Sequence, residues 1–404
     1  MAYDWRQGLP IFRGRSVTLR EPRLADSQVL YAQLTTPLVT RHISTPPATP
    51  GGFERFISWV QHERALGRHA CFVMIPDGLS QPVGLLQVRQ LEANFGTGEW
   101  GFALGQEFWG SGIFMESAPL VLDFAFRDAR FHRLEARAAV DNRRGNRVLE
   151  KLGAVFEGIL RQSFSNDRSN ADQMLWSIVA DEGLAAHPVP FERAGEPALQ
   201  PPEDKLDRRP PVPAPWRSGL PELHGDGVTI RELRLEDAES LASLFADPEV
   251  GRYIPPPPAS TKDFARFISW AHEQRESGTV ICFAVVPDGR ETAVGVLQLH
   301  EVEPDFYISE WGFVMGRPYW GTGLFQRSAE LLLRFAFETV GVHRLEARAM
   351  AANPRANAVL RKLGATEEGH LRRSFLLGGQ YHDDVLWSIL DADWRKRLAA
   401  GASK

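Results

Sequence analysis

The chain has little of what marks several large protein classes. Only two cysteines occur among its 404 residues, and no apolar run approaches the roughly 18 residues of a membrane helix. Basic residues do not outnumber acidic ones, because 46 Lys and Arg stand against 51 Asp and Glu. These shortages argue against a disulfide framework, a membrane partner and a nucleic-acid partner. We therefore expect a soluble, cytoplasmic protein.

Signals for export and for metal binding are also missing. The opening MAYDWRQGLPIFRGR has no apolar core followed by a small-residue cleavage site. His132 and His343 each begin an HRLEA run, with no second His or Cys at ligand spacing, so we interpret them as structural and predict no metal. Cys71 and Cys282 lie in apolar runs and are expected to be buried thiols in separate domains.

What the chain does have is a long internal repeat. Trp59 and Trp270 stand 211 positions apart, as do Trp100 and Trp311, and the two copies align without a gap. A period this long, used twice, indicates duplicated globular domains rather than a solenoid, whose units run about 20–50 residues. We predict a first domain at 9–185, a Pro-rich linker at 186–216 and a second domain at 217–398.

Each copy shows the same order of predicted elements. In the first copy, alternation predicts a strand at 17–23, and helical spacing predicts two helices before residue 67. Three strands follow at 70–76, 83–92 and 98–105, then a long helix, a strand at 132–140, a short helix at 146–153 and a final strand at 172–179. This order predicts an α/β (α+β) unit with a mixed sheet.

The strongest local signal is a glycine-rich turn between a strand and a helix. It reads WGSGIF at 109–114 and WGTGLF at 320–325. Glycine lets the backbone approach a ligand closely, and the next helix N-terminus offers free N–H groups with partial positive charge. The pattern predicts a pyrophosphate site that depends on Gly110, Gly112, Gly321 and Gly323. On this pattern alone, a tight turn without a ligand is an equal alternative.

This turn, the strand before it and the run DNRRGNRVLEKLGA or ANPRANAVLRKLGA resemble the GNAT superfamily of acetyl-CoA-dependent N-acetyltransferases. Within that superfamily, nearly all of each copy resembles the branch that acetylates the N-terminal alanine of ribosomal proteins. Gly112 and Gly323 match the central glycine of the consensus turn Q/R-x-x-G-x-G/A. The resemblance implies two tandem domains, each a mostly antiparallel sheet, flanked by helices and splayed open, with acetyl-CoA in the gap.

The resemblance also implies which residues bind the cofactor. The pantetheine arm would pair with the strand before the turn, near Leu104 or Met315, and Asn142 or Asn353 would face it. Arg144 and Arg355 are candidates for a CoA phosphate, with a solvated surface Arg as the alternative. The predicted set is Leu104, Trp109, Gly110, Ser111, Gly112, Ile113, Phe114, Asn142 and Arg144, and in the second copy Met315, Trp320, Gly321, Thr322, Gly323, Leu324, Phe325, Asn353 and Arg355.

Acetyl transfer to an amine needs a base that removes a proton from the amine. Glu99 and Glu310, each directly before Trp-Gly-Phe, are the predicted catalytic residues. On a strand, such a carboxylate is one step from an apolar stripe, where desolvation would raise its pKa. The alternative is a rim carboxylate paired with an arginine.

The proton donor for the departing thiolate is missing from its usual places. The Tyr of much of the superfamily is Leu149 or Leu360 here, and the Ser of the resembled branch is Gly145 or Ala356. Asn146 and Asn357, one position later, can donate a hydrogen bond but not a proton.

Three interpretations of the function remain open. The first is an acetyl-CoA-dependent N-acetyltransferase acting on a primary amine, either a protein N-terminus or a small molecule. The second is an acyl-CoA-binding regulatory or structural protein, and the third is one active copy paired with the other as a pseudo-dimer. The copies also differ at Pro119, which predicts a helix bent near 115–119 and weaker CoA binding in the first copy.

Overall fold

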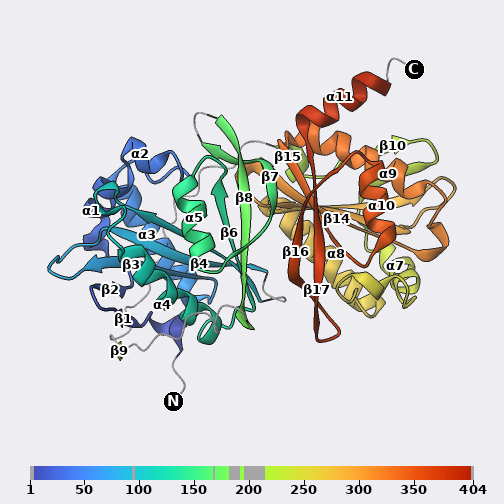
Figure 1. The fold of residues 1–404 in the computed structure, drawn as a ribbon. Helices are drawn as coiled ribbons and strands as arrows, with labels where there is room; N and C mark the ends of the chain where they lie inside the picture. The colour runs from blue at the N-terminus through green and yellow to red at the C-terminus, as the bar shows by residue number, and fades with distance from the viewer. Residues whose placement is uncertain (1–3, 93–95, 167–168, 182–191, 195–213, 402–404) are drawn as a thin grey trace. The chain divides into compact units, whose positions relative to one another are not determined.

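The computed structural model describes residues 4–92, 96–166, 169–181, 192–194 and 214–401. The chain divides into two compact units, each of which contains most of one copy (Figure 1). Most of the predicted linker at 186–216 lies outside the described residues, and the domain limits 9–185 and 217–398 stay predictions.

The first copy follows the predicted order closely. Its first half comprises η1 (Trp5–Gln7), β1 (Ile11–Arg13), β2 (Val17–Arg20), η2 (Leu24–Asp26), α1 (Ser27–Leu34), α2 (Pro37–Thr40), α3 (Pro50–Ala65), β3 (His69–Pro76) and β4 (Gly84–Glu92). Its second half comprises β5 (Thr97–Leu104), η3 (Gln106–Phe108), α4 (Ile113–Arg127), β6 (Arg133–Ala139), α5 (Arg143–Lys151), β7 (Val155–Asn166) and β8 (Ser169–Val179). The short β9 (Glu192–Ala194) pairs with β1.

The second copy repeats this arrangement with small changes. It begins with η4 (Pro215–Arg217), β10 (Leu223–Gly225), β11 (Val228–Glu232), α7 (Asp237–Phe245), η5 (Gly251–Tyr253), α8 (Thr261–Ser277), β12 (Val280–Pro287), β13 (Gly295–Glu301) and η6 (Pro304–Phe306). It continues with β14 (Ile308–Met315), η7 (Arg317–Tyr319), α9 (Leu324–Arg334), η8 (Phe335–Val340), β15 (Arg344–Met350), α10 (Pro354–Lys362), β16 (Thr366–Leu377), β17 (Gln380–Leu390) and α11 (Asp391–Gly401).

Helices cover both faces of each sheet (Figure 1). Successive side chains of a strand point to opposite faces, so one strand contributes to the cores on both sides. On β3, Phe72 and Met74 pack in the core on the side of α4, while Cys71 and Val73 pack in the core on the side of α1 and α3. The second copy repeats the division on β12, with separate cores on the α9 and α8 sides. Both faces of these strands are therefore buried, which is why the runs ACFVMI and ICFAVV are almost wholly apolar.

Each sheet splays open at one place. β5 pairs with β6 in parallel only at Thr97–Glu99, and β14 pairs with β15 only at Ile308–Glu310. β5 continues to pair with β4 as far as Leu104, whereas β6 continues with β8. Among the described residues, the edge of β5 beyond Glu99 has no strand partner on the β6 side. The predicted fold, two mixed and splayed α/β domains, is confirmed.

The predicted final strand at 172–179 is confirmed as part of β8, but the strand before it, β7, was not predicted. In the first copy, β7 and β8 form an antiparallel hairpin. The sequence did not indicate β7, because its apolar residues are exposed and a charged residue is buried. Phe156 and Ile159 are 44% and 43% exposed, while Glu157 is 9% exposed. A register shift between Phe156 and Gly158 further breaks the period of two.

The predicted disturbance at Pro119 is not an interruption of the helix. α4 is a continuous α-helix from Ile113 to Arg127, with Pro119 inside it. Proline lacks the N–H that would pair with the carbonyl of Met115, so this carbonyl has no donor from Pro119 within the helix. The predicted bend of α4 near 115–119 stays a prediction. In the second copy, α9 continues into a π-helix at Phe335–Val340.

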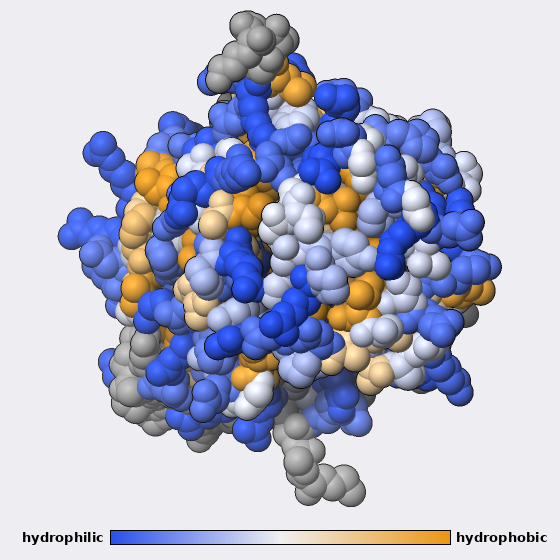
Figure 2. Space-filling view, turned by 90° about the vertical axis from the view of Figure 1, so that its right-hand side faces the viewer, coloured by the Kyte–Doolittle hydropathy of each residue, from blue (hydrophilic) through white to orange (hydrophobic). Residues whose placement is uncertain are grey.

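In the described part of the chain, no helix is both long and apolar enough to cross a bilayer. On the face shown in Figure 2, hydrophobic residues reach the surface as several separate groups among hydrophilic ones. Such scattered exposure is normal for a globular surface.

Candidate cofactor and catalytic site

The glycine-rich turns adopt a backbone that only glycine takes without strain. Gly110 and Gly112 have φ of 82° and 89°, and Gly321 and Gly323 have φ of 75° and 79°. A Cβ added to Gly110, Gly112 or Gly321 would meet no atom within 4 Å. The backbone conformation therefore requires these glycines. The same observation shows that the space in front of the turn is open.

Each turn ends as the N-cap of a helix, where amides are left free. Gly112 caps α4 and Gly323 caps α9, neither with a side-chain cap. The Ile113 amide donates weakly to the Ser111 hydroxyl at 3.4 Å, and the Leu324 amide donates to the Thr322 hydroxyl at 3.3 Å. Within the described residues, the amides of Phe114 and Met115 have no acceptor. Free amides beside a positive helix end fit a phosphate group.

The side chains of Ile113 and Phe114 point away from this opening. Ile113 and Phe114 are each 8% exposed, so their predicted part in cofactor binding is limited largely to the backbone. The Phe114 ring lies 3.9 Å, centroid to centroid, from Phe102 on β5, and Phe325 lies 4.3 Å from Phe313. These pairs explain why both copies depart from the small residue of the consensus turn: the phenylalanine fills apolar space beside the splayed strand.

A tryptophan and an arginine link the turn to the rest of the site. The Trp109 indole donates to the Leu104 carbonyl at 2.8 Å, and the Arg144 guanidinium lies 4.5 Å from the centre of the same ring. In the second copy, Trp320 donates to Met315 at 2.8 Å and Arg355 lies at 4.4 Å. The structure thus brings together predicted residues from a strand, a turn and a helix. Stacking fixes the plane of each arginine beside the glycine turn.

The asparagines at the start of the short helix are structural caps. The Asn142 side chain accepts the Gly145 amide at 2.9 Å, and Asn353 accepts the Ala356 amide at 3.1 Å. These bonds satisfy the first turns of α5 and α10. The predicted contact between these asparagines and the cofactor arm stays a prediction.

Asn146 has no free donor left for a thiolate. Its amide group donates to the carbonyls of Ala139 and Asn142, at 2.9 and 3.0 Å, and its oxygen accepts from Trp176 at 2.9 Å. Asn357 makes the same three bonds, its oxygen accepting from Trp387 at 2.8 Å. The idea that these asparagines hydrogen-bond a departing thiolate is therefore wrong. They fasten the short helix to the sheet.

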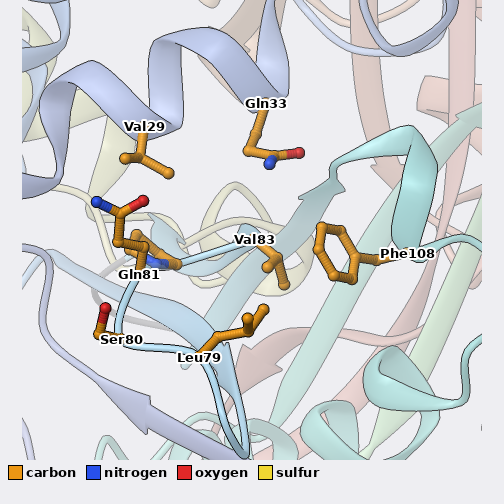
Figure 3. Close-up of a pocket in the computed structure, with 8 residues that line it drawn as sticks. Val29, Gln33, Leu79, Ser80, Gln81, Val83 and Phe108 are labelled. Atoms are coloured by element: carbon orange, nitrogen blue, oxygen red, sulfur yellow. The ribbon is translucent and has the colours of Figure 1, made fainter.

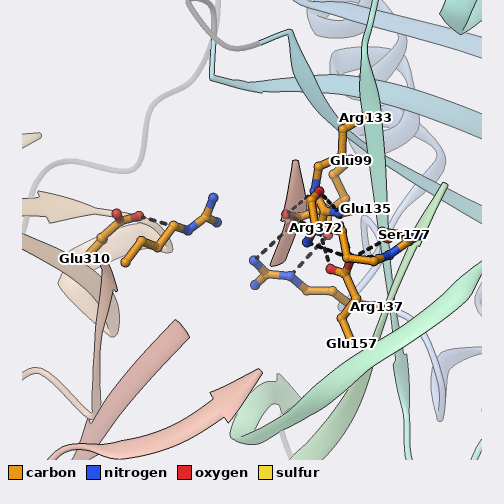
Figure 4. Close-up of polar contacts among 9 residues, drawn as sticks. Glu99, Arg133, Glu135, Arg137, Glu157, Ser177, Glu310 and Arg372 are labelled. Atoms are coloured by element: carbon orange, nitrogen blue, oxygen red, sulfur yellow. Dashed lines mark hydrogen bonds and ion pairs between the residues drawn. The ribbon is translucent and has the colours of Figure 1, made fainter. Parts of the chain in front are cut away.

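The two candidate bases lie at the root of the splay, each at the last residue that pairs with the neighbouring strand (Figure 4). Arg89 Nε donates to Glu99 Oε2 at 2.6 Å, and Arg137 Nε lies 3.8 Å from Glu99 Oε1. In the second copy, Arg348 Nε lies 3.8 Å from Glu310 Oε2. Arginine pairing, the alternative that the sequence left open, is thus present, and it is stronger in the first copy.

A buried ion-pair cluster supports this region and was missed in the sequence. Arg133, fully buried, contacts Glu135 and Glu157, and Ser177 donates to Glu157 at 2.6 Å (Figure 4). Burial opposes the charge on Arg133, but the two glutamates outweigh it and raise its pKa. The run HRLEAR, which both copies contain, could have indicated this cluster, because an Arg and a Glu two positions apart face the same side of a strand.

The same cluster exists in the second copy. Arg344 Nε contacts Glu346 at 2.8 Å and its Nη2 contacts Glu368 at 2.6 Å, with Ser388 donating to Glu368 at 2.5 Å. In the first copy, Arg137 Nη2 lies 4.0 Å from Glu135, which joins the cluster to the candidate base Glu99. Through Arg137, the buried cluster of the first copy is therefore connected to its candidate base.

Two further groups of predicted residues take no part in the site. Cys71 and Cys282 are free and buried, as expected, and burial raises the pKa of Cys282 to about 12. His343 Nδ1 lies 3.6 Å from Asp391, and burial lowers the pKa of His343. In the described residues, no group of three or more His, Cys, Asp or Glu is placed to hold a metal ion.

A hollow of about 150 Å³ lies elsewhere in the first copy, between α1, the turn after β3 and η3 (Figure 3). Val29 and Gln33 line one side and Phe108 another, with Leu79–Val83 between them. None of the predicted cofactor or catalytic residues lines this hollow. In the second copy, Arg290 occupies the position of Leu79 and lies 5.6 Å from the Tyr319 ring.

A splayed mixed sheet, a left-handed glycine turn and a helix N-terminus without a side-chain cap are present in both copies. The acetyltransferase (GNAT) domain matches residues 16–155 and 228–366, and the chain belongs to this family. It is an N-acetyltransferase with two such domains.

Each curated relative spans about one copy. The chain is 25% identical over 173 residues to the uncharacterized N-acetyltransferase p20 of Bacillus licheniformis, covering 43% of this chain and 97% of that protein. It is 25% identical over 190 residues to the [ribosomal protein uS5]-alanine N-acetyltransferase of Escherichia coli, covering 44% and 96%. It is 27% identical over 172 residues to the spermidine N(1)-acetyltransferase of Escherichia coli, covering 42% and 88%.

Proposed function

We propose that each copy binds acetyl-CoA in the splay of its sheet and transfers the acetyl group to a primary amine by direct attack on the thioester. The observation that carries the proposal is the left-handed turn at Gly110–Gly112 and Gly321–Gly323, which leads into free helix amides beside an unpaired strand edge. That combination fits both the phosphates and the amide-containing arm of CoA.

The residues divide the work as follows. The amides of the turn and of the first helical turn hold the pyrophosphate, and the Trp–Arg stack adds a fixed cation beside it. The free edge of β5 or β14 orients the arm, with Leu104 or Met315 at its end. Acetyl-CoA supplies the activated acyl group. Glu99 or Glu310 takes the proton from the amine, directly or through one water.

No side chain is assigned to protonate the thiolate. Leu149 and Leu360, at the position of the usual tyrosine, are 1% and 0% exposed, and neither carries a proton to give. Water protonates the thiolate in this proposal. The acceptor class is a primary amine, either a protein N-terminus as for the uS5 relative or a polyamine as for the spermidine relative.

The same lack of an acid favours a second candidate function, in which the chain binds acyl-CoA in a regulatory or structural role and one or both copies are catalytically weak. The discriminating experiment incubates the full chain with acetyl-CoA and a panel of amines, including spermidine and an alanine-starting peptide, and follows release of free thiol. We expect amine-dependent release that Glu99→Gln with Glu310→Gln removes while CoA binding persists. The control pair is Glu54→Gln with Glu273→Gln, carboxylates on α3 and α8 away from the splay.

Three results separate the candidates. Thiol release that depends on both an amine and the two glutamates supports transfer. CoA binding without release on any amine supports the regulatory alternative. Absence of CoA binding to either copy overturns both.

A further inference from the structure

The first turns of the two cofactor helices carry opposite charges at one equivalent position. Four residues after the N-cap glycine, α4 has Glu116 and α9 has Arg327. A second difference accompanies it, because Ser16, which contacts Glu116, is Gly227 in the second copy. The two positions therefore differ together between the copies.

Arg327 lies directly against the glycine turn of the second copy. Its Nη1 is 2.9 Å from the place that a Cβ on Gly323 would occupy, and its Nη2 is 3.7 Å from the same place at Gly227. Its Nε is buried and has no hydrogen-bond partner. Among the described residues, Arg327 forms no ion pair. A guanidinium with unused donors thus stands beside amides that are also free.

Glu116 occupies the matching place in the first copy and is held there. Its Oε1 accepts the Ser16 amide at 2.8 Å, and its Oε2 accepts the Ser16 hydroxyl at 2.6 Å. Burial opposes ionisation of this carboxyl, but the hydrogen bonds from Ser16 outweigh burial and lower its pKa. A fixed negative charge in the first turn suits the helix dipole, and for the same reason it opposes an anionic ligand there.

We propose that Arg327 is a CoA phosphate-binding residue present only in the second copy, and that Glu116 makes the first copy the weaker CoA site. This inference rests on the proposed function, in which both copies bind CoA. It adds that the two sites differ in affinity for CoA. When the cofactor is limiting, the second copy binds it first and carries out the transfer. The shared parts of the site, the glycines and the Trp–Arg stack, give no such order.

The test is a calorimetric titration of the full chain with CoA at low and moderate salt. Gly112→Trp and Gly323→Trp chains isolate one site each, because the side chain added at 112 projects into the open space before the turn, and the one added at 323 lies against Arg327 and displaces it. We expect the second copy to bind at least about tenfold more tightly, since one charge-assisted phosphate contact is worth about that factor or more. Arg327→Gln should remove this advantage, and Glu116→Gln should tighten the first site.

A matched control is Arg334→Gln, which removes the same charge from the other end of α9, where the side chain is 62% exposed. Arg327→Gln is also titrated without any glycine substitution, so that a folding defect at Gly323 cannot decide the result. Dephospho-CoA identifies the contact: if its affinity is insensitive to Arg327→Gln, the residue binds the 3′-phosphate, and if sensitive, the pyrophosphate. Either outcome supports the inference.

Two results would overturn the inference and leave the proposed function intact. One is equal CoA affinity at the two isolated sites. The other is an Arg327→Gln chain that binds CoA as the Arg334→Gln chain does. If neither copy binds CoA in any of these chains, the proposed function itself has failed.

Discussion

The two copies share the residues that hold the backbone of the site and differ in the charged residues around it. Both have the left-handed glycines, the tryptophan that bonds to the end of the cofactor strand, and the fully buried arginines Arg133 and Arg344. They differ in the charged residues nearest the candidate base and the phosphate turn. The comparison teaches that the scaffold tolerates little change, whereas the chemistry can be tuned on top of it.

The residue that lies opposite the candidate base on the neighbouring strand differs between the copies. Arg89 stands opposite Glu99 and donates to it at 2.6 Å, whereas the residue opposite Glu310 is His300. Burial lowers the pKa of His300, so this histidine is uncharged near neutral pH. Glu99 therefore has a permanent cation across the strand and Glu310 a neutral ring. An amine or water reaching Glu99 has to compete with Arg89 for the same oxygen.

The largest expected effect concerns these glutamates. Glu310→Gln should lower turnover of the second copy by about 10²–10⁴-fold and leave CoA affinity nearly unchanged, because the change keeps shape and removes the base. Glu99→Gln should have a smaller effect on the first copy. Thiol release in Gly112→Trp and Gly323→Trp chains reads each copy alone.

Exchanging the cross-strand residues sharpens the same comparison. Arg89→His should raise turnover of the first copy, and His300→Arg should lower that of the second. Equal losses from both glutamate substitutions, together with no response to the exchange, would show that the residue across the strand does not matter.

The next largest expected effect is the loss of stability when a buried arginine is replaced. This loss should be equal in the two copies. Arg344→Met removes the guanidinium that pairs with the buried carboxylates of Glu346 and Glu368, at a cost of about 3–5 kcal/mol in the free energy of unfolding. Urea unfolding should show the transition of the altered copy shifted, with Arg334→Met as an exposed control. A shift no larger than that of the control would mean that the cluster contributes little.

A pH-dependent term should appear in the first copy at His69, whose counterpart is Val280. Burial, with a smaller contribution from Arg89, lowers the pKa of His69 to about 4, although a hydrogen bond with Gln87 at 2.9 Å opposes the shift. The unfolded chain takes up this proton near pH 6.5 and the folded chain does not. Stability should therefore fall as pH drops from 6.5 to 4, by up to about 3 kcal/mol.

The check is the pH dependence of urea unfolding for His69→Val, which places the residue of the second copy in the first. This chain should lose less stability than the wild type between pH 6.5 and 4. Parallel pH profiles would assign the acid sensitivity to other groups.

The smallest expected effect is at Pro119. Because one helix bond to Met115 is absent, amides near 115–119 should exchange hydrogen faster than those at 326–330 of the second copy. Pro119→Ala restores the donor and should stabilise the first copy by about 1 kcal/mol. Equal exchange in the wild type, with no gain from alanine, would show that water replaces the bond at no cost.

The sequence predicted the fold best where a residue type is required by the local backbone or by a simple apolar pattern. Gly112 and Gly323 indicated a glycine turn between a strand and a helix, and the apolar runs around Cys71 and Cys282 indicated strands with buried thiols. The constant spacing of 211 positions between matching tryptophans was enough to indicate the duplication. These features depend on local backbone or on patterning, which a sequence displays directly.

Long-range pairing was harder to predict. The hairpin strand at Val155–Asn166 exposes Phe156 and buries Glu157, so its pattern is reversed. Glu157 is buried because Arg133, distant in sequence, is its partner, and only the fold brings them together. For the same reason Asn146 resembled a free donor in the sequence, although Trp176 and two carbonyls use all of its capacity.

The measurement that tests the account most directly is the number of CoA molecules bound by the full chain at saturation. Two turns with the same left-handed glycines and free amides predict a stoichiometry of two, falling to one in either the Gly112→Trp or the Gly323→Trp chain and to none when both are changed. A wild-type stoichiometry of one, unaltered by one of these substitutions, would contradict the claim that both copies are cofactor sites.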